Sequence, residues 1–591
     1  MAFQPPIEEI AFTLDKIAGL DAALAGGIFG DLSSDTVTAI LNEAGRFAAE
    51  ELAPINRTGD RVGARRDNGS VMTPPGWAEA YRRFRAAGWN GIVAPEAWGG
   101  QSLPVMLGMA VQELWNAGAA AFAVGPMLTG GAIEALAAHA SPSLKELYLP
   151  RLASGEWMAT MNLTEPQAGS DLGAVRTRAE RAGDGTYRLF GQKIFITFGE
   201  HDFTDNIVHL VLARLSDAPE GTRGISLFLV PKRIPNADGA LITRNDVVCA
   251  GIETKLGLHG SPTCTMLYGG NGDGAVGWLV GEENRGLACM FTMMNSARLS
   301  VGIQGIGVAD RAYADALSYA RERRQGRAPG ADGAGMSPIV DHPDVQAMLL
   351  RMKAMTAAAR AICYLTANAI DLSRRGNEVE RSRHADRAGL LTPIAKAFAT
   401  DIGIEVASLG IQVHGGMGFI EETGAAQHLR DVRVFAIYEG TNGIQAIDLV
   451  TRKLKLAGGD AVKSLLGELD AIAAAAEMSN RSGLGETGKR LAAALRHLRA
   501  ATDFLLAALD RGEVGEALAG ATPYLRLFAL TLGGALLAKG GLASDDEGKW
   551  TALARYFAET IIDETAALAA TVTGGAAALR QAAFSVLSNG E

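Results

Sequence analysis

The chain has 591 residues, which is too long for a single hydrophobic core and predicts three or four domains. Hydrophobic residues make up 48% of it, enough for sizeable cores. Its formal net charge of −10 at pH 7 argues against a general affinity for nucleic acid or for anionic membranes.

The first residues of the chain include no basic region, and they are acidic where a signal peptide would be apolar. The nine histidines show no HxH or HExxH spacing, and the four cysteines are far apart and form no CxxC pair. This pattern is typical of a reduced cytoplasmic chain without a structural metal. We therefore expect a cytoplasmic protein with no metal site and with free thiols at Cys249, Cys264, Cys289 and Cys363.

Residues 1–155 are expected to form an N-terminal helical domain. An amphipathic stretch runs from Thr36 to Leu52. The longest apolar stretch, residues 118–138, is interrupted by Pro126 and by Gly130-Gly131. It predicts a buried helix pair rather than a membrane span.

Residues 156–280 are expected to form a central β domain. The short β-rich runs are separated by turn signals, and no helical period fits between them, so we expect an antiparallel barrel or sandwich. Residues 272–277 match GxGxxG, but residues 278–280 continue as a strand, whereas a dinucleotide-binding fold needs a helix there. The β-rich runs are Trp157–Leu163, Tyr187–Thr197, Ile207–Arg214 and Gly224–Pro231.

Residues 281–456 return to long helical patterns and are expected to form a four-helix bundle. A Gly/Ala/Pro-rich loop at 326–338 interrupts them. Residues 457–591 are rich in Ala and Leu, with leucines at helical spacing, and predict an additional C-terminal helical domain with a packing role. The chain is thus expected to be an α+β multidomain protein.

The segment 437–444 combines a carboxylate, a glycine and a helix start. Glu439 is followed by Gly440, and then by Thr441 or Asn442 as the N-cap of the helix. The first turn of a helix favours negative charge, and a glycine lets another group approach closely. These residues leave two readings open: a general base beside a bound anion, or a surface loop with an acidic capping residue. The apolar face of the helix is expected at Ile444, Ile447, Val450 and Leu454.

Six short motifs follow one another in a characteristic order. They are Thr164-Glu-Pro-Gln-Ala-Gly-Ser-Asp171, Phe195-Ile-Thr197, Arg323-Arg-Gln325-Gly326, Gln412-Val-His-Gly-Gly-Met-Gly-Phe419, Arg430-Asp431 and Tyr438-Glu439-Gly440-Thr441. In this order they resemble the acyl-CoA dehydrogenase family over residues 40–456. Two departures affect packing around the cofactor: Phe195 stands where the family has Trp, and Gly326 where it has Phe.

The resemblance implies an FAD-dependent enzyme that converts an acyl-CoA thioester to the trans-2-enoyl-CoA. Glu439 would be the catalytic base and flavin N5 the hydride acceptor. Substrate contacts are implied for Ser170, Arg298, Tyr438 and Gly440. Cofactor contacts are implied for Thr164, Gly169, Ser170, Phe195, Ile196, Thr197, Arg323, Gln325, Gln412, Gly415, Gly416 and Thr441. Taken singly, each of these has an ordinary structural reading, such as a strand threonine for Thr197.

The resemblance also implies partners. Arg323 and Gln412 lie on helices with which the family completes its neighbour's FAD site, so a homodimer or a dimer of dimers is expected. Electron-transfer flavoprotein would be the electron acceptor, with no nucleic acid and no membrane insertion.

The opening residues 3–10 and the extra C-terminal region are similar to the longer branch of the family that contains 3-methylmercaptopropionyl-CoA dehydrogenases. The expected substrate is therefore 3-methylmercaptopropionyl-CoA, an intermediate of dimethylsulfoniopropionate degradation. Three alternatives remain: a general short- or medium-chain acyl-CoA dehydrogenase, an acyl-CoA oxidase, and a non-enzymatic flavoprotein of the alkylation-response type.

Overall fold

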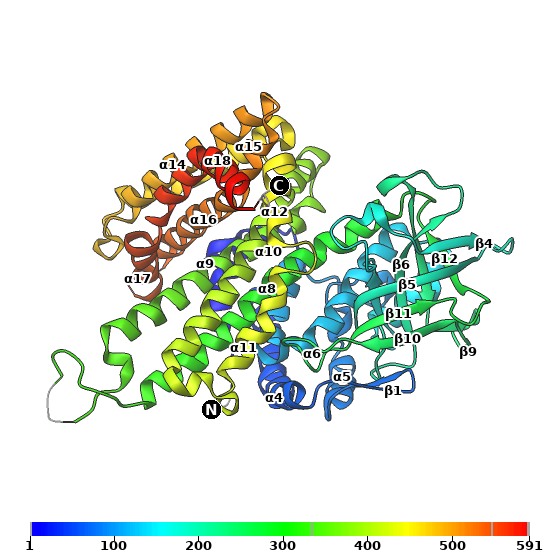
Figure 1. Ribbon diagram of the computed structural model, residues 1–591. Coiled ribbons are helices and arrows are strands. Elements are labelled where there is room, and N and C mark those ends of the chain that lie inside the picture. The colour runs from blue at the N-terminus through cyan, green and yellow to red at the C-terminus, as the bar shows by residue number, and fades with distance from the viewer. Residues whose placement is uncertain (1–2, 332–334, 545–547, 588–591) are drawn as a thin grey trace. The chain divides into compact units, whose positions relative to one another are not determined.

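The computed structural model describes residues 3–331, 335–544 and 548–587 (Figure 1). The chain forms two compact units, and each is described here by itself. The β unit comprises residues 1–5, 44–104 and 114–297, and the helical unit comprises residues 6–43, 105–113 and 298–591. Residues 332–334, within the loop expected at 326–338, lie outside the described residues.

The β unit contains a closed ring of five strands. In this ring β5 pairs with β12, β12 with β7, β7 with β6, and β6 with β4, which pairs back to β5. Strands β11 and β10 extend from β5, and β3 adds to β6. The expected barrel and its position in the middle of the chain are confirmed. The strands are β3 (Met158–Asn162), β4 (Arg178–Arg181), β5 (Tyr187–Thr197), β6 (Ile207–Leu215), β7 (Ile225–Pro231), β10 (Val247–Ile252), β11 (Thr263–Tyr268) and β12 (Ala275–Val280).

Two strand pairs in the β unit are parallel, so the expectation of a purely antiparallel domain is wrong for them. Both β3 and β4 run parallel to β6. A parallel pair needs a long connection rather than a hairpin, and the chain between β3 and β6 supplies one because it contains β4 and β5. The GxGxxG match leads into β12, a strand, as the sequence predicted. Two small hairpins, β1 (Arg65–Asp67) with β2 (Ser70–Met72) and β8 (Arg233–Pro235) with β9 (Leu241–Arg244), complete the β structure.

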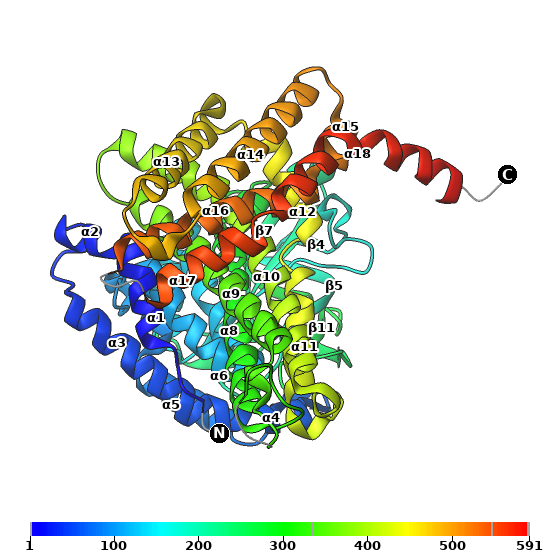
Figure 2. The ribbon, with the colours of Figure 1, turned by 90° about the vertical axis from the view of Figure 1, so that its left-hand side faces the viewer.

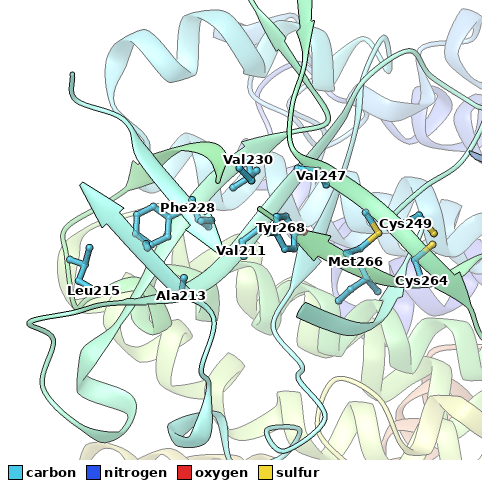
Figure 3. Packing of buried hydrophobic residues seen from close by; sticks show 14 of the residues in the cluster. Val211, Ala213, Leu215, Phe228, Val230, Val247, Cys249, Cys264, Met266 and Tyr268 are labelled. Carbon is cyan, nitrogen blue, oxygen red and sulfur yellow. The ribbon is translucent and has the colours of Figure 1, made fainter. Parts of the chain in front are cut away.

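Apolar side chains from alternating strand positions fill the core of the β unit (Figure 3). Val211 and Phe228 are direct cross-strand partners, and both are fully buried. Cys249 and Cys264 belong to the same core. All four cysteines of the chain are buried and free.

The longest apolar stretch is part of one helix, so the expected helix pair is corrected. Helix α6 (Val105–His139) continues through Pro126 and departs from helical geometry at Ala119, where φ is −155° and ψ is 91°. Neither glycine ends the helix, and Gly131 serves packing, since a Cβ on it would lie 3.0 Å from Met293 Cγ. The other helices with residues in the β unit are α3 (Ser34–Phe47), α4 (Ala53–Val62), α5 (Trp77–Ala86), α7 (Pro142–Ala153) and the start of α8 (Gly286–Glu322).

The helical unit is built on long helices that pack closely. A Cβ on Gly305 of α8 would lie 2.6 Å from the carbonyl oxygen of Ala399 on α10, so glycine is needed at this crossing. Besides α8, the helices are α1 (Ile7–Phe12), α2 (Leu20–Ala25), α9 (Pro343–Ser373), α10 (Glu378–His414), α11 (Ala425–Val432), α12 (Asn442–Asp448), α13 (Asp460–Met478), α14 (Thr487–Asp510), α15 (Val514–Ala519), α16 (Ala521–Ala543), α17 (Lys549–Tyr556) and α18 (Glu564–Leu587).

The C-terminal helices belong to the core of the helical unit. Helix α16 packs on α9, α10 and α12, and α14 and α18 lie beside it (Figure 2). A Cβ on Gly533 of α16 would lie 2.9 Å from Ala358 Cβ on α9. The N-terminal arm, residues 6–25, packs on these C-terminal helices, because the rings of Phe12 and Trp550 stack with centroids 4.4 Å apart.

Two helices, α6 and α16, are long and apolar enough to cross a membrane by length and composition. In α6 89% of the most apolar window is buried inside the protein, and in α16 83%. Core helices have the same properties, so these two features are weak evidence for a membrane span.

Candidate active site

Glu439 lies in the turn between α11 and α12, in the helical unit. Its φ is +57°, and that of Gly440 is +85°, so two successive residues are left-handed. A non-glycine residue in this conformation costs about 1–3 kcal/mol and persists where its surroundings hold it. Thr441 caps α12, since its hydroxyl accepts a hydrogen bond from the Ile444 backbone N–H at 3.3 Å. The expected helix start is confirmed.

The expected apolar face is only partly borne out: Val450 and Leu454 are fully buried, but polar side chains take the buried positions within α12. Gln445 and Asp448 are buried, whereas Ile447 is 38% exposed. The reason is that this side of α12 makes polar contacts with the turn. The amide nitrogen of Gln445 donates to the carbonyl oxygens of Glu439 and Gly440, both at 3.3 Å.

Gly440 is required by space as well as by its backbone conformation. A Cβ there would lie 2.8 Å from Gln445 Nε2. The same Gly440 carbonyl also accepts a hydrogen bond from Lys396 Nζ at 2.9 Å. The turn is thus held from two helices, α10 and α12.

Three charged groups set the electrostatics around the turn. Burial raises the pKa of Glu439 to about 7, against the nearby positive charges of Arg298 and Lys396. Burial lowers the pKa of Lys396 to about 8, and it also lowers the pKa of Arg298, which is 9% exposed. A carboxylate with a pKa near 7 is matched to proton abstraction at neutral pH.

Tyr438, the residue before Glu439, is fixed by its own contacts. Its hydroxyl donates to the side-chain oxygen of Gln304, which is fully buried. Its ring stacks on Phe435 with centroids 5.8 Å apart and planes 13° apart. Contact with a substrate would therefore come from the ring of Tyr438.

The residues expected at the adenine half of FAD gather at one end of two packed helices in the helical unit. Tyr319 near the end of α8 stacks on His414 at the end of α10, with centroids 4.5 Å apart. Arg323 follows α8 and donates to Gln325 at 3.3 Å, and both side chains are exposed. Gln412, Gly415 and Gly416 at the end of α10 are exposed as well.

The loop expected at the flavin pyrimidine edge lies in the β unit and is organised by a buried carboxylate. Glu165 accepts hydrogen bonds from Lys193 Nζ at 2.8 Å, Thr177 Oγ1 at 2.6 Å and the Arg176 backbone N–H at 2.8 Å. Burial acts against its ionisation, yet the Lys193 charge and these hydrogen bonds hold the pKa of Glu165 at about 2. The loop residues Thr164, Gly169 and Ser170 are left half-buried or exposed.

The end of β5 lies next to this loop, because the Ile194 backbone N–H donates to the Thr164 carbonyl at 2.9 Å. Phe195 has a left-handed φ of +59° and is 60% exposed, and Thr197 is half-buried. An exposed aromatic ring beside polar loop groups fits a flat aromatic ligand such as a flavin. Ile196 is buried in the barrel core, so only its backbone can serve the site.

Sequence reasoning missed the residues that hold these groups. The sequence carries a weak signal for three of them. Lys396 is the one charge in the apolar run from Ile394 to Ala399, and Glu165 and Lys193 lie within or beside motif residues. Gln304 and Gln445 carry no comparable signal. The missed residues are Glu165, Lys193, Gln304, Lys396 and Gln445.

Family models describe nearly the whole chain. The acyl-CoA dehydrogenase N-terminal, middle and C-terminal domain models match residues 34–156, 160–269 and 284–454. An acetyl-CoA dehydrogenase C-terminal-like model matches residues 465–583. The 3-methylmercaptopropionyl-CoA dehydrogenase of Ruegeria pomeroyi is 44% identical over 585 residues, covering 96% of this chain and 97% of that protein. The chain belongs to the acyl-CoA dehydrogenase family. As a member it is an FAD-dependent oxidoreductase.

Other members extend this likeness. A butyryl-CoA dehydrogenase of Syntrophomonas wolfei is 36% identical over 468 residues, covering 77% of this chain and 75% of that protein. An acyl-CoA dehydrogenase from Bacillus anthracis, solved in complex with FAD, has the same fold with a TM-score of 0.74 at 22% identity, covering 95% and 92% of the two chains. A chain from a study of the electron transferring flavoprotein of Acidaminococcus fermentans matches with a TM-score of 0.58 at 27% identity, over 71% of this chain and 98% of that one.

Proposed function

We propose that this chain oxidises 3-methylmercaptopropionyl-CoA to the corresponding trans-2-enoyl-CoA, with Glu439 as the base. The environment of Glu439 supports this chemistry. Glu439 is half-buried, and the pKa of its carboxyl is about 7. The near full-length likeness to the Ruegeria pomeroyi enzyme supports the substrate.

In the proposed reaction, the ionised Glu439 takes a proton from the carbon next to the thioester carbonyl. The backbone N–H of Glu439 would donate to the thioester oxygen as negative charge develops on it. Arg298 and Lys396 favour the ionised form of the base before the reaction. FAD supplies the hydride acceptor when it is bound.

We propose that FAD is held by two sets of residues. Backbone and hydroxyl groups of Thr164, Gly169, Ser170 and Thr197 would meet the flavin, with Phe195 beside the ring. Thr441 would contact the cofactor at the start of α12. Arg323, Gln325, Gln412, Gly415 and Gly416 would meet the adenine half, where an exposed guanidinium suits a pyrophosphate.

We also propose a homodimer or a dimer of dimers in the cytoplasm, with electron-transfer flavoprotein as the acceptor. The cofactor residues at the ends of α8 and α10 are exposed in the single chain, as expected if a neighbouring subunit completes the site. A monomer that kept its full FAD content on a sizing column would contradict the assembly.

The substrate is tested by comparing kcat/KM for 3-methylmercaptopropionyl-CoA, butyryl-CoA and octanoyl-CoA with an artificial electron acceptor. The proposal expects the sulfur-containing substrate to have the highest kcat/KM. A clear preference for octanoyl-CoA would overturn it, and equal use of butyryl-CoA would favour a general short-chain enzyme.

Two measurements separate the remaining readings. A stoichiometric yield of hydrogen peroxide in air, undiminished by an artificial acceptor, would indicate an oxidase. Salt-resistant binding of duplex DNA would favour the alkylation-response type, and the net charge of −10 argues against it.

A further inference from the structure

Lys396 is a fully buried lysine in the middle of α10, surrounded in sequence by apolar residues. An unpaired buried ammonium is strongly unfavourable, so such a group needs partners. Its two hydrogen-bond acceptors among the described residues are the Gly440 carbonyl and the Asn442 side-chain oxygen, both at 2.9 Å. Both acceptors belong to the three residues that follow the base.

Asn442 makes further hydrogen bonds to α10. Its amide nitrogen donates to the Thr400 hydroxyl at 3.0 Å and to Asp401 at 2.7 Å. The segment of α10 from Lys396 to Asp401 is therefore hydrogen-bonded to the start of α12. Because Gly440 lies between Glu439 and Asn442, these hydrogen bonds limit how far Glu439 can move.

The charges that face Lys396 come from three elements. Glu439 lies on the turn, Asp401 on α10 itself and Arg298 on α8. Glu439 in turn faces Arg298 and Lys396, and it lies beside the neutral hydroxyl of Tyr438, whose pKa is raised well above its usual range by burial. Lys396 is thus one of the two cations acting on Glu439.

We propose that Lys396 is a positioning residue for the dehydrogenation: its ammonium group holds the Glu439–Asn442 turn and favours the ionised form of the Glu439 carboxylate. The inference rests on the proposed role of Glu439 as the base. A neutral hydrogen-bond donor would hold the turn equally well. The effect of Lys396 on the ionisation of Glu439 therefore depends on its positive charge.

The test is the titration of Glu439 in the substrate-free holoenzyme, followed by infrared difference spectroscopy of the protonated carboxyl and assigned by its absence in Glu439→Gln. Removing one nearby cation in Lys396→Met should raise the pKa of Glu439 by about one pH unit. Flavin reduction by acyl-CoA at pH 7 should then fall roughly fivefold from the lost ionised fraction, and this part of the loss should disappear by pH 9.

Two further variants separate charge from packing. Lys396→Gln keeps a neutral donor and should show the same rise, which also covers the case in which Lys396→Met does not fold. Thr400→Val loosens Asn442 without removing a charge and should leave the pKa of Glu439 unchanged. An unshifted titration in both Lys396 variants, or an equal shift in Thr400→Val, would overturn the proposal.

The activity of Glu439→Gln distinguishes failure of the proposed function from failure of the proposed role of Lys396. If Glu439→Gln reduced its flavin as fast as the wild type, the function itself would fail, whatever the Lys396 variants did. If Glu439→Gln were inactive and the Lys396 variants titrated like the wild type, the role of Lys396 alone would fail.

Discussion

Gln445 donates its side-chain amide to the backbone carbonyl of Glu439, six residues earlier in the chain, at 3.3 Å. A side chain of α12, the helix that follows Glu439, therefore closes the turn that carries Glu439. This contact explains why the first turn of α12 buries a polar side chain, and how a left-handed glutamate is maintained.

Replacing Gln445 by Met should loosen the turn while keeping the volume of the side chain. We expect a loss of about 1–2 kcal/mol in the free energy of unfolding, because the part-buried carbonyls of Glu439 and Gly440 each lose a donor. Flavin reduction should slow by about tenfold as the base becomes misplaced. Denaturant unfolding and stopped-flow absorbance measure the two effects.

Ile447→Ala, on the more exposed side of α12, is the control and should change stability by less than about 0.5 kcal/mol. Equal effects of the two variants would contradict this account of the turn.

Glu439→Gln should make the protein more stable at neutral and alkaline pH. The pKa of Glu439 is raised in the folded state, to about 7 from 4.5, so its favourable contribution is complete below pH 4.5 and is lost as the pH rises to 7. Glutamine carries no charge and avoids this loss. The advantage of the variant should grow by about 1–2 kcal/mol between pH 5 and pH 8, after allowance for solvent screening. A difference in unfolding free energy that did not change with pH would argue against the raised pKa.

The rate of flavin reduction in the wild type should rise with pH and level off above about pH 7. In the proposed reaction the ionised form of Glu439 is the active one, and the pKa of Glu439 is about 7. Single-turnover rates between pH 5.5 and 9 measure this profile. A rate that is flat down to pH 5.5 would mean that the base titrates as an ordinary glutamate.

The Glu165–Lys193 pair should matter for cofactor binding, because it organises the loop from Thr164 to Ser170. Glu165→Gln leaves Lys193 buried without its counter-charge, which typically costs 3–5 kcal/mol when a buried pair is broken. We expect FAD affinity to fall by more than about tenfold in the single variant. Affinity is measured by fluorescence titration of the apoprotein.

The double variant Glu165→Gln/Lys193→Met is the matched comparison for this pair. It removes both charges and should recover most of the stability lost in Glu165→Gln, but not the FAD affinity, because the loop still lacks its organising carboxylate. Unchanged FAD affinity in both variants would show that the loop holds its shape without the pair.

The N-terminal arm should release at low pH. Burial acts against the ionisation of Glu9, but Lys353, Arg360 and Lys549 hold its pKa at about 2, below the usual 4.5. Its contribution to stability is therefore present above pH 4.5 and is lost as the pH falls towards 2. Hydrogen exchange of residues 6–25 should speed up over this range in the wild type. In Glu9→Gln it should already be fast at pH 6, and slow exchange there would contradict the prediction.

Local pattern predicted much of the fold. Strands β5, β6 and β7 follow continuous β-rich runs, and Thr441 caps α12 as its residue type indicates. Strand β4 was not foreseen, because it has four residues and only one buried side chain, yet it closes the barrel. Its pairing with β6 brings together segments distant in sequence, and local periodicity carries no information on that.

For the proposed site, the motifs indicated the candidate reacting residues, whereas the residues that support them were not predicted. Glu439 and Thr197 lie in recognisable segments. Gln445 acts through backbone carbonyls, which any polar side chain of suitable length can reach, so no residue pattern marks it. Lys396 is marked only weakly, as a single charge within an apolar run. The left-handed backbone at Glu439 depends on these contacts and could not be read from the sequence.

The most direct test of the account is anaerobic stopped-flow flavin reduction by 3-methylmercaptopropionyl-CoA in the wild type and in Glu439→Gln. Both proteins should fold, bind FAD and bind the acyl-CoA, since glutamine keeps the shape of the side chain. The variant should be slower by about 10²–10⁴-fold or more, because water removes a proton from carbon poorly. A variant that kept more than about a tenth of the wild-type rate, while Glu421→Gln or Glu422→Gln abolished it, would contradict the assignment of Glu439 as the base.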